Sequence, residues 1–464
     1  MRGSRLSGAA ALFFCLLFLL TGMLWISRPG LQNDEALFAS GMYGPFLRDY
    51  YISIFQVHVP TMVMTYVGAL KGWIYQPVFA LWDPSAASIR FPVLLIGAAT
   101  VSLFYVFLRR VASERAALAG CALLATDSIF LFTTRLDWGP VALQHLLLVG
   151  GCAALVLFQQ RKSLAALGVG FFIFGLGMWD KALFSWMLIG LACAGIATFP
   201  RVLLRALTVR HVAIATLAFL LGSLPLLIFN LRTEWSTFRG NTQFSTEGFQ
   251  EKAELLRYTL SGEALFGYVT RESHEGPARQ PETSGERLSV WLSDAAGHPR
   301  TNLLLYATAL SLLCLPWLWF TPARKPLVFA LVFTIVTWLQ MAFTKGAGAG
   351  AHHTVLLWPF PLMFIAITLD AACRRAGARG KPLFAIVLAA LVVSNLLVTN
   401  HYYAQLIRYG GGAAWSEAIY PLSDSLHKLE ADEVHVLDWG MLNSLRLLHE
   451  GELDLRVGSD PVMD

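Results

Sequence analysis

Two adjacent carboxylates, Asp34 and Glu35, follow the first apolar run of the chain in the stretch LQNDEALFASGMY. An ionised carboxylate that is kept from bulk water can accept a proton from a hydroxyl group or hold a divalent cation. A plainer interpretation is structural, with Asn33 or Asp34 capping a helix whose first turn favours acidic side chains. The two interpretations are compatible, and the sequence leaves both open.

Basic side chains lie near the ends of later apolar runs. Arg135 occurs in FTTRLDWGP, where it could bind a phosphate through two hydrogen bonds or pair with Asp137 to fix a hairpin. Lys181 occurs in the short turn GMWDKALF, where it could neutralise a lipid phosphate or extend to the membrane surface. Arg90 begins an apolar run in SIRFP, and we interpret it as a surface anchor in preference to a phosphate ligand.

A loop of small residues separates Lys345 from His352 and His353 in TKGAGAGAHHTVLLWPFP. Glycine lets a backbone approach a ligand closely, and Lys or His can offset the charge that develops on a phosphate. Adjacent histidines could also bind a metal, but neighbours on a helix point in different directions and no Cys or Asp cluster accompanies them. This loop is therefore predicted to face a phosphate.

Together these residues combine an acid pair with cations from at least three later segments. The combination suits a reaction in which a hydroxyl attacks a carbon whose leaving group is a lipid-linked phosphate. The acid activates the nucleophile, and the cations stabilise the departing anion.

The elements that must position these groups are membrane helices. Of the 464 residues, 56% are hydrophobic and 14% are charged, against roughly 25% charged in a soluble domain. No Lys/Arg tract or basic helix face accompanies the net charge of +5, so nucleic acid is not an expected partner. Eleven runs are apolar and about 20 residues long, as a membrane span requires, namely 9–27, 89–108, 116–134, 139–158, 163–179, 182–199, 212–229, 302–320, 326–343, 354–370 and 382–399.

The short loops that would be cytoplasmic are rich in basic residues if the N-terminus is cytoplasmic, as the positive-inside rule requires. Alternation then places the acid pair and every cation of the preceding argument on the outer side. The first run lacks a clear A-x-A cleavage site, so we expect a retained helix in preference to a signal peptide. The run Pro60–Trp82 contains Lys71 and Pro77, and counting it as a span would invert all later charges, so it is predicted to lie at the outer interface.

The predicted fold is an all-α polytopic membrane protein with about eleven transmembrane helices and a small C-terminal α/β segment. Residues 1–400 form the membrane domain, with interfacial helices in a first external loop at 28–88 and a flexible external loop at 230–301. Residues 401–464 form the external tail, because EVHVLD alternates like a strand and a helical stretch follows it.

These motifs resemble the C superfamily of membrane glycosyltransferases, in particular family 39 and its bacterial relatives. These include protein O-mannosyltransferases, lipid A aminoarabinose transferases and lipopolysaccharide sugar transferases. The resemblance rests on the acid pair in QNDEALFASGMY, the segment HVPTMVMTYVGAL, the span SIRFPVLLIGAATVSLFYVFLRR, and the elements RLDWGP, GLGMWDKALF and HHTVLLWPFP. Where the family often has a His-Pro-Pro-like element, this chain has His58-Val59-Pro60.

The resemblance implies a site and its substrates. Asp34 would activate the acceptor, and Glu35 would be its structural or electrostatic partner. The donor phosphate would meet the cations of the later segments, with support from Asp137, His58 and Arg90; the cations are Arg135, Lys181, Lys345, His352 and His353. The donor would be a polyprenyl-phosphate sugar, and transfer would invert the anomeric centre.

The acceptor would be a lipid, a glycan or a protein. The chain would lie among the lipids of a bacterial inner membrane, with the active site and tail on the periplasmic side. Branches of the superfamily differ in their use of a divalent metal ion, so no cofactor is assigned and a metal is left open.

Two other classes compete with an enzyme. A lipid or solute transporter would also have many spans and polar chambers, but such proteins usually show duplicated halves with broken helices. The chain shows no such repeat and has long asymmetric outer loops. A scaffold protein would use the outer charges only as topology signals, in which case loss of Asp34 would leave its function intact.

Overall fold

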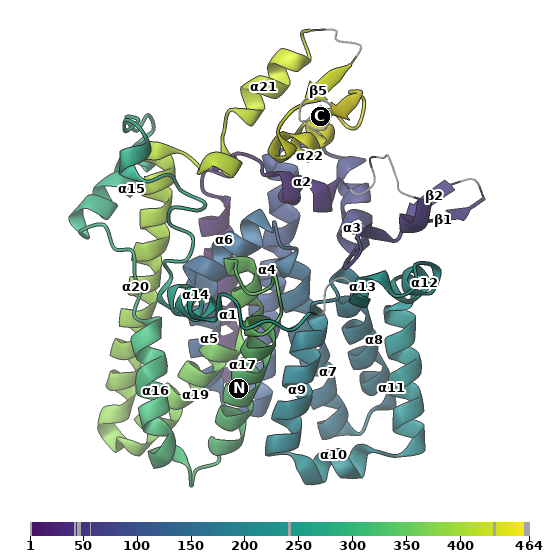
Figure 1. The fold of residues 1–464 in the computed structure, drawn as a ribbon. Coiled ribbons are helices and arrows are strands. Elements are labelled where there is room, and N and C mark those ends of the chain that lie inside the picture. Colours follow the sequence, from purple (N-terminus) through teal and green to yellow (C-terminus); the bar gives the residue numbers. More distant parts are fainter. Residues whose placement is uncertain are drawn as a thin grey trace.

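The computed structural model describes residues 2–40, 43, 48–55, 57–239, 243–429 and 433–458. Figure 1 shows long helices that run side by side in a bundle, with the tail above one end and α10 at the opposite end. The bundle and the short helices at its ends comprise α1 (Arg2–Met23), α4 (Ala86–Val111), α5 (Glu114–Thr126), α6 (Ser128–Leu136), α7 (Val141–Arg161), α8 (Leu164–Asp180), α9 (Phe184–Thr198), α10 (Pro200–Ala206), α11 (Val209–Gly222), α12 (Leu224–Arg232), α16 (Leu304–Leu318), α17 (Arg324–Ala342), α18 (Ala351–Thr354), α19 (Phe360–Arg375) and α20 (Gly380–Tyr409).

Each predicted span coincides with a helix or a pair of helices. Within the described ranges, four helices are long and apolar enough to cross a membrane, and four bent pairs pass the same test together. The apolar segments that match the remaining three predictions are shorter, at Ser7–Met23, Leu164–Asp180 and Leu304–Leu318. The chain is therefore a multi-pass membrane protein, and eleven crossings stays a prediction.

The bend between α5 and α6 has a clear local cause. Asp127 is the N-cap of α6, and its carboxylate accepts a hydrogen bond from the backbone of Phe130 at 2.7 Å. An N-cap residue has non-helical backbone angles, so it interrupts the preceding helix, and the two axes differ by 57°. Asp127, to which the sequence assigned no role, divides this span into two helices.

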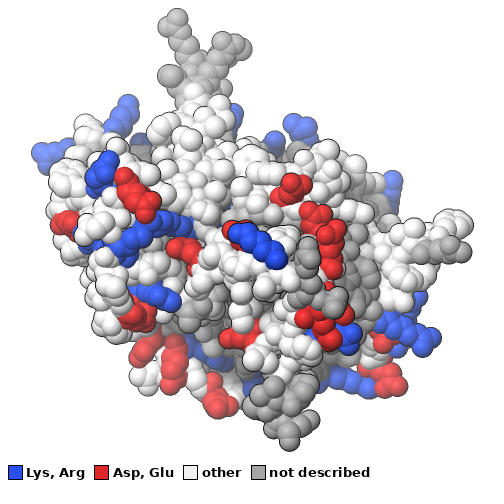
Figure 2. Space-filling view, turned by 90° about the horizontal axis from the view of Figure 1, so that it is seen from above, with Lys and Arg blue, Asp and Glu red and all other residues white. Residues whose placement is uncertain are grey.

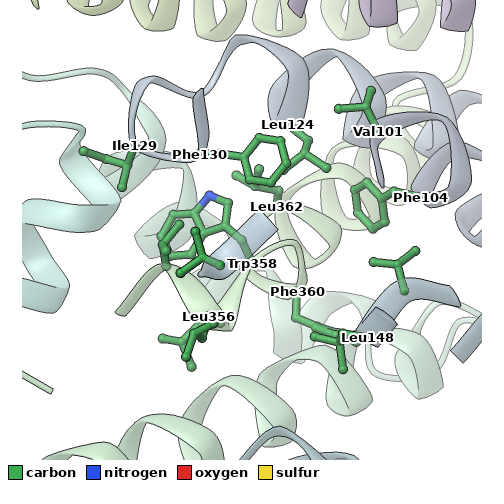
Figure 3. Close-up of a cluster of buried hydrophobic side chains, with 14 of the residues drawn as sticks. Val101, Phe104, Leu124, Ile129, Phe130, Leu148, Leu356, Trp358, Phe360 and Leu362 are labelled. Atoms are coloured by element: carbon green, nitrogen blue, oxygen red, sulfur yellow. The ribbon is translucent and has the colours of Figure 1, made fainter. Parts of the chain in front are cut away.

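The centre of the bundle is a continuous apolar core. Trp358 lies in the segment between α18 and α19, and it packs among Phe130, Leu124 and Leu362 (Figure 3). Burial of large apolar side chains at native density fixes the relative positions of these helices. On the outside of the bundle, Leu313 and Ile386 are 77% and 67% exposed, as expected for side chains that face lipid.

The first external loop is partly helical and partly extended. It contains α2 (Asn33–Ala39), η1 (Arg48–Tyr50), β1 (Tyr51–Ile54), β2 (Val57–Pro60), β3 (Met62–Met64), β4 (Val67–Gly68) and α3 (Leu70–Phe79). The first two strands form an antiparallel hairpin that projects beside the bundle, and the next two form a second antiparallel pair (Figure 1). The segment 60–82 was predicted as helical material at the interface; its first part instead pairs as strands, and the helix within it is α3.

The loop at 230–301 is more ordered than predicted. It contains α13 (Ser236–Arg239), α14 (Phe249–Ser261), η2 (Ser273–Glu275) and α15 (Ser284–Ala295). Thr283 and Glu286 form a capping box that begins α15, and this helix packs against α20. The prediction of a flexible loop therefore missed α14 and α15.

The tail begins later than predicted. Helix α20 continues through residue 401 and ends at Tyr409, and the tail then comprises η5 (Ala413–Trp415), α21 (Ile419–Leu426), β5 (Val434–Val436), α22 (Trp439–Leu448) and β6 (Leu455–Val457). The two strands pair in parallel, with Val434 opposite Leu455. Seen from the side of the tail, the molecule carries acidic and basic side chains interspersed (Figure 2).

Candidate active site

Helix α2 presents the acid pair beneath the tail. Its N-cap is Gln32, whose side-chain oxygen accepts hydrogen bonds from the backbone N–H groups of Asp34 and Glu35 at 2.7 and 3.2 Å. The predicted caps, Asn33 and Asp34, instead lie within the first turn. The helix has acids in that turn, where the helix dipole favours negative charge.

The two acids have different surroundings. Glu35 is fully buried, and Arg90 Nε and Nη2 contact its two carboxylate oxygens at 2.7 and 2.9 Å. Asp34 is half-buried. Burial raises the pKa of Asp34, and the side chains of Asn33 and Gln32 and the charge of Lys181 act in the opposite direction. Of the pair, Asp34 is the carboxylate that a substrate could reach.

Arg90 is not a surface anchor. Its guanidinium is fully buried, and beyond Glu35 it donates to the carbonyls of Ile26, Pro29 and Gly30 at 2.7, 2.8 and 3.1 Å. An arginine has five N–H donors, so it can hold a carboxylate and several carbonyls together. Arg90 therefore fixes the segment that leads into α2.

Arg135 holds the same segment from the other side. Its Nη2 donates to the carbonyls of Trp25 and Arg28 at 2.5 and 2.6 Å, and its Nη1 donates to the Tyr403 hydroxyl at 2.8 Å. The side chain is fully buried. The prediction that Arg135 binds the donor phosphate does not fit this placement, because these contacts turn the guanidinium toward the backbone of the first loop.

A buried ion pair lies below α2. Lys71 Nζ on α3 lies 2.8 Å from Asp137 Oδ2, and both side chains are at most 3% exposed. Asp137 has left-handed backbone angles at the end of α6, and its Oδ1 accepts a hydrogen bond from the backbone of Ala142 at the start of α7. Asp137 therefore pairs with Lys71, not with Arg135, and fixes the turn between the two helices.

Lys181 lies close to this pair. Its ammonium donates to the carbonyl of Gly139 at 2.7 Å. Burial lowers the pKa of Lys181 to about 8, against the opposing charges of Asp180, Asp137 and Asp34. Lys181 is thus a buried cation whose field reaches the Asp34 carboxylate.

Aromatic side chains surround this acid and lysine. Burial raises the pKa of Tyr66 and of Tyr268, and the negative charge of Asp34 raises both further. Both tyrosines therefore lie near Asp34. The Trp138 ring contacts the rings of Tyr268 and His352, with centroids 6.1 and 5.6 Å apart.

His352 also packs on Gly139, whose carbonyl receives the Lys181 hydrogen bond. A side chain at Gly139 would place its Cβ 2.5 Å from the His352 ring, so only glycine fits there. Asp34, Lys181, Tyr66, Tyr268 and His352 are therefore neighbours, and we treat them as the candidate site.

The other predicted loop residues lie differently. His353 is half-buried, and its Nδ1 accepts a hydrogen bond from the backbone of Gly348 at 3.2 Å, which fixes the glycine loop. Lys345 is exposed and lines a separate pocket beside α14. His58 is exposed on the projecting hairpin, where it contacts Ser53 and Tyr51. His58 was predicted to support the site. Its exposed position on the hairpin does not fit that role.

A metal ion was left open by the sequence. Within the described ranges, no group of three or more His, Cys, Asp and Glu side chains is arranged to hold one. The Glu35 carboxylate is already occupied by Arg90. Among the described residues, those around Asp34 do not form a ligand set of this kind.

Sequence reasoning missed Lys71, Tyr66 and Tyr268 as members or supports of the site. Lys71 was noticed only as a charge in an apolar stretch. A buried lysine needs an acidic partner, and that requirement was the one available signal. The two tyrosines come from loops whose approach to Asp34 depends on the tertiary fold, so no local pattern marked them.

Comparisons with known proteins agree with this description. Residues 68–229 match the model of the dolichyl-phosphate-mannose-protein mannosyltransferase family. The fold is similar to that of ArnT from Cupriavidus metallidurans bound to undecaprenyl phosphate, with a TM-score of 0.59, 12% identity, and coverage of 97% of this chain and 86% of that chain.

The fold is also similar to the Archaeoglobus fulgidus oligosaccharyltransferase in complex with Zn and sulfate. The TM-score is 0.53 and the identity 14%, over 91% of this chain and 56% of that chain, so the chain spans little more than half the length of that protein. No curated protein sequence matches the chain. The family match over residues 68–229 and the shared fold confirm the resemblance to the C superfamily of membrane glycosyltransferases.

Proposed function

We propose that the chain transfers a sugar from a polyprenyl-phosphate carrier to an acceptor hydroxyl on the periplasmic side of a bacterial inner membrane. The observation that carries the proposal is the half-buried Asp34 carboxylate in the field of Lys181. It occurs on a fold shared with ArnT, which was solved with undecaprenyl phosphate.

The reaction needs a base and a group that stabilises the leaving phosphate. The acceptor oxygen attacks the anomeric carbon from the face opposite the phosphate, and its proton passes to the Asp34 carboxylate. The bond between the anomeric carbon and the phosphate oxygen breaks, and its electron pair leaves with the phosphate. This displacement inverts the anomeric centre. A positioned base contributes about 10²- to 10⁴-fold to such a step.

The two lysines near Asp34 have different roles in this proposal. Lys71 is paired with Asp137, so its charge is already balanced. The Lys181 ammonium donates to the Gly139 carbonyl, and the acids whose charges act on it are Asp180, Asp137 and the proposed base Asp34. We assign Lys181 to the departing phosphate, because charge stabilisation is strongest in a site that excludes water.

A pocket lined mostly by apolar side chains shares Tyr66 with the site and suits the lipid part of the donor. It has a volume of about 380 Å³ and extends from Tyr66 and Ala182, next to Lys181, along α9 and α17. Burial of a prenyl unit in such a pocket is favourable in proportion to the apolar area removed from water. Its lining includes Leu183, Trp186, Ile189, Phe238, Phe244 and Phe343.

The test is a direct assay of bond cleavage. Purified protein in detergent is incubated with a panel of polyprenyl-phosphate sugars and with lipid, glycan and peptide acceptors, and free polyprenyl phosphate is measured. Acceptor-dependent release supports the proposal. A protein that moves the intact donor across vesicle membranes, with no lipid phosphate released from any donor, would instead be the transporter considered above.

A further inference from the structure

Helix α15 exposes its apolar side and buries its polar side. Its buried side chains are mostly polar, and they are Glu286, Ser289, Val290 and Ser293. Leu288, Trp291 and Leu292 are 56%, 61% and 37% exposed. Positions three and four residues apart lie on one side of a helix, so these three side chains form a single outward apolar face. A helix at the surface of a soluble domain has the reverse arrangement.

The polar side of α15 is fixed against α20. A hydrogen bond of 2.7 Å joins Ser293 Oγ to His401 Nδ1, and Asn400 Nδ2 donates to the Ser289 carbonyl at 2.9 Å. Buried polar groups need such partners. The apolar face cannot turn toward the protein without breaking these contacts, so its outward direction is part of the fold.

The contacts with α20 also give the depth of α15 in the membrane. Helix α20 is long and apolar enough to cross the bilayer, and its apolar run ends at residue 399. His401, which contacts Ser293, lies about 3 Å beyond that end along the helix axis. The polar layer of a bilayer is about 5–8 Å thick on each side. This part of α15 is therefore level with the polar layer.

The two flanks of α15 differ in charge. Asp294 Oδ2 accepts a hydrogen bond from Arg408 Nη2 at 2.7 Å. Arg408 lies about 14 Å beyond residue 399 along α20, which is outside the polar layer. Arg287 is exposed and lies on the same flank as Asp294, because seven residues make nearly two helical turns. The charged flank thus faces water, and Leu292 lies nearly opposite it, toward the bilayer.

The apolar face of α15 continues a surface that faces lipid. Helix α16 follows α15 in the chain, and its side chains Tyr306, Leu310 and Leu313 are exposed. Their spacing of four and three residues places them on one side of α16. Figure 1 shows α15 at one edge of the molecule, beside the outer end of α20 and above α16. Lipid that surrounds these two helices therefore also reaches α15.

We propose that α15 is an interfacial helix, whose face of Leu288, Trp291 and Leu292 enters the outer polar layer of the bilayer and contacts lipid. A helix with one apolar face and a charged flank lies in the plane of the interface. Tryptophan is enriched at this level of membrane proteins. The proposal does not depend on the transferase reaction, and a protein that is inactive with every donor leaves it open to the same test.

The experiment measures what surrounds each side of α15 in the full-length protein in lipid nanodiscs. Leu288→Cys places a thiol on the apolar face, and Arg287→Cys places a matched thiol on the charged flank of the same helix. Both are labelled with an environment-sensitive fluorophore through a maleimide, and the wild type labelled in parallel gives the signal from the native cysteines. Quenching is measured with iodide in the water and with a doxyl group near the headgroup of the lipid. Thermal unfolding checks that each variant is folded.

We expect the doxyl lipid to quench the label at position 288 several-fold more than the label at position 287, and iodide to show the opposite order. Quenching of both labels by iodide, with no effect of the doxyl lipid at position 288, would place the face in water and overturn the proposal. A label at position 288 that is shielded from both quenchers would also overturn it, because another protein or a second copy of the chain would then cover the face. If Leu288→Cys does not fold, Leu292→Cys takes its place with the same expected result.

Discussion

Adjacent acids in one turn of helix take different roles because of their partners. Glu35 is closed off by Arg90, whereas Asp34 is half-buried and lies in the field of Lys181. The sequence predicted that this pair is important, because acids are costly near a membrane. It did not show which acid is available, since that depends on Arg90, 55 residues away in the chain.

Dependence on tertiary contacts also explains why the role predicted for Arg135 does not fit the structure. Arg135 has the residue type and the spacing of a phosphate ligand, but both properties also suit an arginine that binds carbonyls. Its contacts with Trp25 and Arg28 come from the end of the first helix. Only the tertiary fold distinguishes the two roles. Lys181 also occurs in a short local motif. Unlike Arg135, it lies within the candidate site, where its charge acts on Asp34.

The ionisation of these two groups predicts a bell-shaped dependence of kcat/KM on pH. Activity should rise as Asp34 loses its proton, at a pH above the usual range of an aspartate because its pKa is raised. Activity should fall as Lys181 loses its charge, with a midpoint at about pH 8. Initial rates of lipid phosphate release, measured from pH 4 to pH 10 with subsaturating donor, give both limbs.

Lys181→Arg assigns the alkaline limb. Arginine keeps its charge to a pH of about 12, so this variant should lose the alkaline limb and keep the acid limb. Wild-type activity should drop roughly tenfold between pH 7 and pH 9, while that of the variant stays level. An alkaline limb that survives in Lys181→Arg would show that another group titrates there. Lys325→Arg, a conservative change at the start of α17, serves as the control.

At the scale of elements, the site depends on how firmly α2 is held. Arg90 on α4 and Arg135 on α6 together bind five carbonyl groups of the segment Trp25–Gly30, which leads into α2. Helix α3 carries Lys71 beneath α2, and α22 covers it from outside. A short helix that would be marginal alone is thus fixed by elements from four parts of the chain.

Removal of Arg90 should therefore be costly. Arg90→Met leaves the Glu35 carboxylate buried without its partner, and breaking such a pair lowers the free energy of unfolding by about 3–5 kcal/mol. The double variant Glu35→Leu/Arg90→Met should recover part of that loss, because it leaves no unpaired charge. Unfolding in a denaturing detergent measures both. A single variant as stable as the wild type would contradict this account of how α2 is held.

Helices that contain a long apolar run were predicted well, and helices with few apolar residues were not. Each of the eleven apolar runs corresponds to a helix or a bent pair of helices, because length and hydropathy are local properties. Helices α14 and α15 were taken as a flexible loop, since they are held by tertiary packing, with α14 against α16, α17 and α18 and α15 against α20. Similarly, α20 passes the predicted boundary at residue 400, as its polar end is helical where it packs on α15.

At the scale of the whole molecule, the polar chemistry gathers at one end of the bundle. Helix α2, the tail and α15 lie at this end, and α10 lies at the other (Figure 1). The basic residues that the positive-inside rule assigns to the cytoplasm include Arg201 and Arg205, which lie on α10. The positive-inside rule and the fold therefore distinguish the same two ends of the bundle.

This separation predicts the orientation of the protein. Gly276→Cys, in the outer loop before α15, should react with a membrane-impermeant maleimide added to intact spheroplasts. Ala378→Cys, between α19 and α20, should react only after the membrane is opened. Both positions are exposed, so reagent access depends on the side of the membrane. The reverse pattern would place the candidate site in the cytoplasm and contradict the proposed periplasmic reaction.

The central claim is that Asp34 accepts the proton of the attacking hydroxyl. The most direct measurement is the rate of polyprenyl phosphate release by Asp34→Asn, which keeps the shape of the side chain and removes its charge, beside the wild type and a folding control by thermal unfolding. We predict a folded variant whose rate falls by at least about 10²-fold. A folded Asp34→Asn protein that turns over at the wild-type rate would contradict the mechanism.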